Sequence, residues 1–365
     1  MAVIFPRGFL FTKDCLVMFI HSVRFGVMVL IGCGLLNHVL ASTPAPKLRE
    51  LTTGTEASLR GVAVAGKKEA WVSGSAGTVM RTTDAGKSWD RVRVPDADEL
   101  DFRDVEIPTP GTILLMAAGP GKASKLVRSV DSGKSWKVVL QNTNPEGFFD
   151  GMDFDETGKH GLLYGDPING RLDLYVTHDG GASWKPTPPD GRPTLQQGEY
   201  GFAASGTGIT ISKSVAYVAT GGALARVWRS TDWGQSWEVA TTPVHAGDES
   251  SGIFSIGFLD ANRGLVVGGD YAQPQLNEGN LARSSDGGKT WVAQPDVKLE
   301  HKACLRPLGK EGVVVCGRTG VAISRDSGKT WQSVEGGGYF TVDVDVNARV
   351  AYLAGSDGRV ATLQW

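Results

Sequence analysis

One eight-residue pattern recurs six times along the chain and limits the folds that the chain can adopt. Each copy reads [ST]-x-D-x-G-x-[ST]-W, a small polar turn that ends in tryptophan. The copies are TTDAGKSW (82–89), SVDSGKSW (129–136), THDGGASW (177–184), STDWGQSW (230–237), SSDGGKTW (284–291) and SRDSGKTW (324–331). They lie roughly 40 to 55 residues apart, a period that is typical of stacked supersecondary units.

The sequence between two copies reads as short β-strands separated by turns. In 58–94, apolar runs at 59–65, 70–74 and 78–82 are separated by polar or Gly-containing turns, and a last strand covers 88–94. Alternating polarity and β-branched residues favour strands, and no ten-residue stretch has helical periodicity. Four antiparallel strands per repeat make one blade of a β-propeller.

The number of copies predicts the number of blades. Six copies define six blades, and 339–365 supplies three further strands. A strand within 46–53 then completes a seventh blade from both termini, which leaves no open sheet edge. We therefore predict an all-β, seven-bladed propeller over 58–365, preceded by a linker and closing strand at 42–57. A six-bladed ring is the alternative if the last segment only caps.

The repeated turn has a structural explanation. Its Asp can accept hydrogen bonds from backbone N–H groups of its own turn, its Gly permits positive φ, and its Trp can pack inward from the outer strand. Six identical carboxylates spread around a ring cannot share one active site. We therefore assign structural roles to Asp84, Asp131, Asp179, Asp232, Asp286 and Asp326, and to Trp89, Trp136, Trp184, Trp237, Trp291 and Trp331.

The N-terminal residues 1–41 read as a secretory signal peptide. Arg24 precedes a short apolar run at 25–36, and Val39–Ala41 offers small residues for cleavage, with Met18 as an alternative start. The apolar run is too short for a comfortable membrane span, so we expect no transmembrane segment in the mature chain. We expect a secreted or periplasmic protein. The LIGC segment at 30–33 leaves lipidation of Cys33 as the alternative.

Two cysteines, Cys304 and Cys316, lie in the body of the chain, on adjacent apolar runs. A hairpin would bring them opposite each other, which permits a disulfide in an oxidising compartment. Two buried free thiols are the alternative. No Cys/His spacing suggests zinc, so we expect neither a metal nor a cofactor.

The charge pattern bears on partners. The formal net charge is −2, and no Lys/Arg-rich run with interleaved aromatics occurs. We therefore expect no nucleic-acid partner, and we expect a monomer.

The six turns resemble the bacterial neuraminidase (BNR, or Asp-box) repeat of sialidases, sortilin-type receptors, xyloglucan-active glycosidases and photosystem II assembly-factor-like proteins. The longer unit WVSGSAGTVMRTTDAGKSW (71–89) is most similar to the last group. YGDPINGR, GEYGFAASGT, GIFSIGF and VVGGDY resemble segments of its uncharacterised bacterial members, some of which are labelled oxidoreductase or glycosidase. The resemblance implies a propeller with an assembly-factor-like function.

Strand polarity sorts the loops into two faces. The repeated turns connect third and fourth strands, so second-to-third turns and blade-to-blade connections lie on the opposite face, here called the loop-rich face. Irregular loops on a rigid scaffold commonly carry function. The candidate ligand-binding residues on this face are Asp150, Asp166, Glu199, Tyr200, Asp248, Glu249, Asp270 and Tyr271.

These features favour a non-catalytic extracytoplasmic protein that binds a protein or carbohydrate ligand. The alternative is a glycoside hydrolase that uses two carboxylates roughly 5–9 Å apart, drawn from Asp166, Glu199, Asp248 and Asp270. The absence of an RIP-type motif before the first repeat argues against sialidase activity. An oxidoreductase is a weaker hypothesis, because the sequence contains neither G-x-G-x-x-G opening a helix nor CxxCH.

Overall fold

The structure is a computed structural model, and it describes residues 45–365. The predicted signal peptide (1–41), the alternative start at Met18 and the lipidation site at Cys33 lie outside the described residues and stay predictions. The described residues form one compact unit. Over residues 45–365, no helix is both long enough and apolar enough to cross a membrane.

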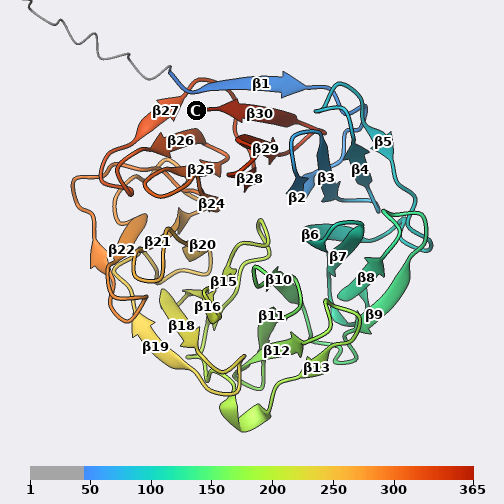
Figure 1. Ribbon diagram of the computed structural model, residues 1–365. Helices are drawn as coiled ribbons and strands as arrows, with labels where there is room; N and C mark the ends of the chain where they lie inside the picture. Colours follow the sequence, from blue (N-terminus) through green and yellow to red (C-terminus); the bar gives the residue numbers. More distant parts are fainter. Residues whose placement is uncertain (1–44) are drawn as a thin grey trace, which may run out of the picture. The chain divides into compact units, whose positions relative to one another are not determined.

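Seven antiparallel sheets are arranged as a ring of blades (Figure 1). The first blade contains β2 (Leu59–Ala65), β3 (Glu69–Gly74), β4 (Val79–Thr82) and β5 (Asp90–Arg91). The second contains β6 (Asp101–Thr109), β7 (Thr112–Ala118), β8 (Lys125–Ser129) and β9 (Lys137–Gln141), with the 3-10 turn η1 (Gly121–Ala123) between β7 and β8. The third contains β10 (Phe149–Phe154), β11 (Gly161–Ile168), β12 (Arg171–Thr177) and β13 (Lys185–Pro186), followed by the 3-10 turn η2 (Pro189–Gly191).

The remaining blades complete the ring. The fourth contains β15 (Ile209–Ser212), β16 (Val215–Ala219), β18 (Arg226–Ser230) and β19 (Glu238–Thr241). The fifth contains β20 (Ser251–Phe258), β21 (Gly264–Asp270), β22 (Leu281–Ser284) and β23 (Val292–Ala293), and it is extended by β17 (Gly221–Gly222) and β14 (Glu199–Tyr200). The sixth contains β24 (Cys304–Pro307), β25 (Val313–Gly317), β26 (Gly320–Ser324) and β27 (Gln332–Val334).

The seventh blade is built from both ends of the described chain. It contains β28 (Thr341–Asp345), β29 (Val350–Ala354) and β30 (Val360–Gln364), and β1 (Lys47–Leu51) pairs antiparallel with β30. The register runs from Lys47 opposite Gln364 to Leu51 opposite Val360. The seven-bladed prediction, with its two-terminus closure, is confirmed, and the six-bladed alternative is wrong.

The core consists of apolar clusters, and each of the six repeat tryptophans joins a different one. Trp291 packs with Tyr217, Ile256 and Phe258, and Trp184 packs with Phe149, Met152 and Phe154. Both Trp side chains are 8% exposed. Burial of such a ring stabilises the fold by about 2–3 kcal/mol.

Three hydrogen bonds to the Asp carboxylate recur in all six repeated turns. The carboxylate of Asp131 accepts bonds from the backbone N–H and the hydroxyl of Ser135, at 2.9 and 2.6 Å, and from the hydroxyl of Ser129 at 2.8 Å. Gly133 has φ of 83°. The Ser135 hydroxyl and backbone N–H, with Ser129, lower the pKa of Asp131 to about 2. The Asp side chain is therefore committed to its own turn.

One segment closes the central channel. Residues 201–208, here called the channel plug, directly precede β15 and enter the middle of the ring (Figure 1). The Ser205 hydroxyl donates to the Ala303 carbonyl at 2.8 Å, and the Thr207 hydroxyl lies 2.7 Å from that of Ser255. A Cβ on Gly206 would come within 2.4 Å of the Asp104 carboxyl, so glycine is required at this close approach. The plug divides the channel into two mouths.

Candidate functional site

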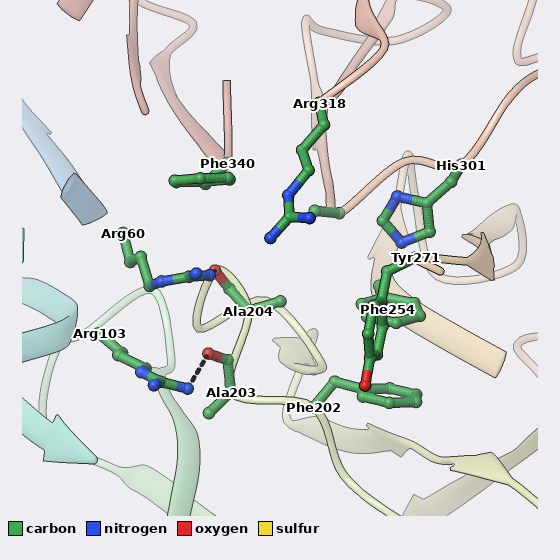
Figure 2. Close-up of a pocket in the computed structure, with 11 residues that line it drawn as sticks. Arg60, Arg103, Phe202, Ala203, Ala204, Phe254, Tyr271, His301, Arg318 and Phe340 are labelled. Atoms are coloured by element: carbon green, nitrogen blue, oxygen red, sulfur yellow. Dashed lines mark hydrogen bonds between the residues drawn. The ribbon is translucent and has the colours of Figure 1, made fainter. Parts of the chain in front are cut away.

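A cavity of about 300 Å³ opens at the mouth of the channel on the loop-rich face. Several of its residues lie near the beginnings of inner strands, because all inner strands run in the same direction through the ring. Tyr271 and Arg318 follow the ends of the second strands β21 and β25, which reach the same face. The lining residues are Arg60, Arg103, Phe202, Ala203, Ala204, Phe254, Tyr271, His301, Ala303, Arg318 and Phe340. The plug residues Ala203 and Ala204 form its floor (Figure 2).

One side of the cavity, here called the arginine wall, contains Arg60, Arg103, Arg318 and Phe340 (Figure 2). The guanidinium of Arg60 lies 4.5 Å from the centre of the Phe340 ring, and that of Arg318 lies 5.8 Å from it. Such cation–π contacts hold charged groups in place without neutralising them.

The three arginines differ in how their charge is balanced. Arg103 pairs with Asp101 at 2.8 Å and donates to the Ala203 carbonyl at 3.2 Å. Within 45–365, neither Arg60 nor Arg318 forms a salt bridge with a carboxylate. Burial and the nearby Arg103 lower the pKa of Arg60 from its ordinary value of 12.5. The wall therefore presents unbalanced positive charge to the cavity.

The opposite side, here called the aromatic wall, contains Phe202, Phe254, Tyr271 and His301 (Figure 2). Phe202 and Phe254 stack with centroids 3.9 Å apart. The Tyr271 ring contacts both of them edge-on, with its centroid 6.5 Å from that of Phe202 and 6.1 Å from that of Phe254. His301 meets Phe254 edge-on at 4.6 Å. The rings of this wall pack against one another and form an apolar surface on which a further flat group can stack.

His301 has an unusual environment for a histidine. Its side chain is 3% exposed, and neither ring nitrogen has a hydrogen-bond partner among residues 45–365. Burial, followed by Lys302 and Arg318, lowers its pKa to about 4, against the opposing effect of Asp270. The ring is therefore neutral near pH 7 and offers one donor and one acceptor.

Among the eight predicted site residues, Tyr271 alone lines this cavity. Tyr200 packs behind Phe202 at 5.5 Å, and its hydroxyl donates to the Glu249 carbonyl. Asp270 accepts hydrogen bonds from the backbone N–H of Ala272 at 2.8 Å and from Gln273 at 3.2 Å. Asp248 and Glu249 lie exposed in the loop before β20.

Glu199 belongs to a buried ion pair rather than to the cavity. Its carboxylate pairs with Arg226 and accepts hydrogen bonds from the Thr220 hydroxyl at 2.6 Å and the Gln196 backbone N–H at 3.0 Å. The Glu199 side chain is fully buried. It holds β14 against the blade that follows it, so it has no free oxygen for acid–base work.

Asp150 and Asp166 lie in strands β10 and β11, whereas the sequence placed them in loops. Asp150 is 2% exposed, and its Oδ2 has no partner among the described residues. Burial and the neighbouring Asp166 raise the pKa of Asp150 well above its ordinary value. Burial raises the pKa of Asp166 to about 6, although the Gly201 backbone N–H donates to it.

The four acids nominated for glycoside hydrolysis are in different environments. Asp166 lies behind the plug, Glu199 is in its ion pair, Asp248 is exposed and Asp270 is in its turn. None of them lines the cavity.

The other mouth of the channel has the opposite charge. A cavity of about 310 Å³ is lined there by residues that include Glu106, Asp153, Asp343 and Arg306. Arg306 pairs with Asp343 at 3.4 Å, and Asp153 accepts a hydrogen bond from the Ile211 backbone N–H at 2.6 Å. Burial raises the pKa of Asp153 to about 6. Over residues 45–365, no group of three or more His, Cys, Asp or Glu side chains could hold a metal ion.

The two body cysteines lie opposite each other in the register of β24 and β25. Both cysteines are buried and have free thiols in the structure. Burial opposes ionisation of Cys304, but contacts with Cys316 and Arg306 lower its pKa to about 6.

Sequence reasoning missed most of the cavity. The lining residues Arg60, Arg103 and Phe340 are not in conspicuous loops, because they stand at the start of inner strands. An alignment of the blades on their repeated turns would have shown these residues at the first positions of inner strands. It would therefore have placed them at the same mouth of the channel.

The fold and the cavity define a class: a seven-bladed propeller with a plugged channel and a basic, aromatic mouth. No protein-family model and no curated protein sequence matches the chain. Among solved structures it is similar to YCF48 bound to a D1 peptide, with a TM-score of 0.63 and 16% identity over 87% of this chain and 97% of that chain. It is also similar to YCF48 from Cyanidioschyzon merolae, with a TM-score of 0.61 and 17% identity over 87% and 98%.

The WD40 propeller domain of Doa1 gives a TM-score of 0.55 at 13% identity, over 88% of this chain and 97% of that chain. At these identities the likeness concerns the fold. It agrees with the propeller that the sequence resemblance implied.

Proposed function

We propose that this protein is a non-catalytic, secreted or periplasmic propeller that captures a protein partner in the cavity on the loop-rich face. The observation that carries the proposal is a pair of arginines, Arg60 and Arg318. Both line the cavity, and neither forms a salt bridge with a carboxylate of residues 45–365. Unbalanced guanidinium groups beside an apolar wall suit an anionic ligand with a flat part.

Two further observations support binding rather than catalysis. None of the nominated carboxylates lines the cavity, so it lacks the pair of carboxylates that a glycoside hydrolase uses. One of the similar structures is YCF48 bound to a D1 peptide, so a propeller of this architecture does bind a polypeptide segment. Localisation outside the cytoplasm rests on the signal-like sequence of residues 1–41.

Affinity capture from an envelope extract of the source cell tests the proposal. The full mature chain is compared with the double variant Arg60→Ala/Arg318→Ala, and Arg93→Ala, an exposed arginine after β5, is the matched control. We expect a discrete partner that the wild type and Arg93→Ala retain and the double variant loses. Equal capture by all three proteins would contradict the proposal.

A further inference from the structure

The two walls of the cavity call for two chemically different parts in one ligand. The arginine wall favours an anion, and the aromatic wall favours a flat apolar group. The cavity volume of about 300 Å³ is at the small end of ligand pockets. Both parts must therefore belong to a small unit.

The anion is best matched by a carboxylate. Arg103 is already paired with Asp101, which leaves Arg60 and Arg318 to bind the ligand. The planar guanidinium presents donors in the fork geometry that fits a carboxylate through two parallel hydrogen bonds. Phe340 supports both guanidinium groups from the side.

The flat group needs a polar atom as well. His301 lines the cavity with both ring nitrogens unpartnered at 3% exposure. Buried polar groups are nearly always hydrogen-bonded in native structures, so such a group points to a partner supplied by the ligand. His301 packs against Phe254 on the aromatic wall, with Arg318 nearby (Figure 2), so a polar atom on the flat group can reach it.

Resting on the proposed function, we infer that the cavity binds the free carboxy-terminus of a polypeptide whose last residue is tyrosine. A terminal residue carries its carboxylate and its side chain on the same Cα, which satisfies both walls within one small cavity. The floor formed by Ala203 and Ala204 stops the chain from passing deeper, which suits an end rather than a continuous segment. The tyrosine hydroxyl bonds to His301.

The titratable and charged groups that face His301 are Lys302 on its own segment, Arg318 after β25 and Asp270 at the end of β21. Their combined effect with burial keeps the imidazole neutral well below pH 6. The selectivity for tyrosine should therefore stay constant from pH 5.5 to 8, whereas a histidine that bound the carboxylate as a cation would lose affinity across this range.

Fluorescence anisotropy on the full mature chain tests the carboxylate. The probes are labelled hexapeptides GSGSAY with a free carboxy-terminus and with a carboxy-terminal amide. We expect the amide to bind at least about tenfold more weakly, and Arg60→Ala/Arg318→Ala to remove this difference, as charge-assisted hydrogen bonds are lost. Arg93→Ala keeps the difference. Equal affinity of acid and amide for the wild type would overturn the inference.

A second pair of probes, GSGSAY and GSGSAF with free carboxy-termini, tests His301. We expect the tyrosine peptide to bind about two- to tenfold more tightly, and His301→Phe to abolish this preference while it keeps the carboxylate-to-amide difference. Thermal unfolding shows whether His301→Phe is folded. If a folded His301→Phe still prefers tyrosine, the assignment of His301 is wrong.

These results separate the inference from the proposed function. If the captured partner depends on Arg60 and Arg318 but neither peptide binds, the carboxy-terminal inference fails and the proposed function stands. If the peptides bind as expected but no partner depends on these arginines, the proposed function fails.

Discussion

The two mouths of the central channel are built from the same inner strands but carry opposite charge. The mouth on the loop-rich face gathers Arg60, Arg103 and Arg318 beside a wall of rings. The other mouth gathers Glu106, Asp153 and Asp343 around Arg306. The channel plug separates them, so each mouth has its own electrostatics.

The difference between the mouths lies in how far each satisfies its own charges. On the acidic mouth, the protein neutralises itself: Arg306 faces the carboxylates, and burial raises the pKa values of Glu106 and Asp153. On the basic mouth, Arg60 and Arg318 lack such partners among residues 45–365. Removing one partner from a balanced buried group is costly, whereas charges that the protein leaves open are available to a ligand.

The largest expected effect on stability comes from Glu199, an acid on the loop-rich face whose role is structural. Glu199→Gln leaves Arg226, whose side chain is 11% exposed, without its counter-charge. We expect the free energy of unfolding to fall by about 3–5 kcal/mol, as measured by urea denaturation, while the folded variant binds the partner with wild-type affinity. Selective loss of binding with unchanged stability would place Glu199 in the site.

The next effect comes from the acidic mouth. Arg306→Met removes the cation that faces Glu106, Asp153 and Asp343, and its side chain is 23% exposed. We expect the free energy of unfolding to fall by about 3 kcal/mol, with no change in the affinity of the basic mouth. A matched fall in binding at constant stability would show that the two mouths are coupled.

The smallest expected effect is a change in the pH dependence of the free energy of unfolding. Burial, with Asp104 and Asp153 nearby, raises the pKa of Glu106 above its ordinary value of 4.5. Between the two pKa values the folded state holds a proton that the unfolded state has released, so the free energy of unfolding falls as pH rises from about 4.5 towards the raised pKa of the folded state. The Glu106→Gln variant has no titratable group at this position, so it loses this contribution to the pH dependence.

Thermal unfolding at pH 5 and pH 8 measures this effect. We expect the fall in Tm between the two pH values to be at least about 2 °C smaller for Glu106→Gln than for the wild type. Lys47→Gln, at an exposed position on β1, is the control. An equal fall for wild type and Glu106→Gln would mean that Glu106 is ionised in the folded state.

The sequence predicted the fold well because the repeats carry it locally. The hydrogen bonds of Asp131 and the packing of Trp291 depend on a few neighbouring positions and on the next blade, so six copies reveal both the blade and its polarity. The outer strand was the least accurate element: β5 spans only Asp90–Arg91, whereas the sequence suggested 88–94.

The site was harder to predict, because it depends on residues that the repeat does not specify. Of the residues that the sequence nominated, Tyr271 lines the cavity, whereas the carboxylate of Glu199 is taken up by its ion pair with Arg226. Arg60 and Arg318 are 258 positions apart (318 − 60), and only closure of the ring brings them to one cavity. Whether a carboxylate such as Glu199 forms an ion pair or remains available to a ligand depends on partners that lie far away in the sequence.

The most direct test of the account is to ask which mouth a partner touches in the source cell. A photo-crosslinking amino acid is placed at Tyr271, which is 43% exposed on the basic mouth, or at Glu156, whose side chain is 73% exposed on the acidic mouth. We predict a discrete crosslinked species from position 271 and none from position 156. Crosslinking from position 156 alone, or equally from both positions, would contradict the assignment of function to the basic, aromatic mouth.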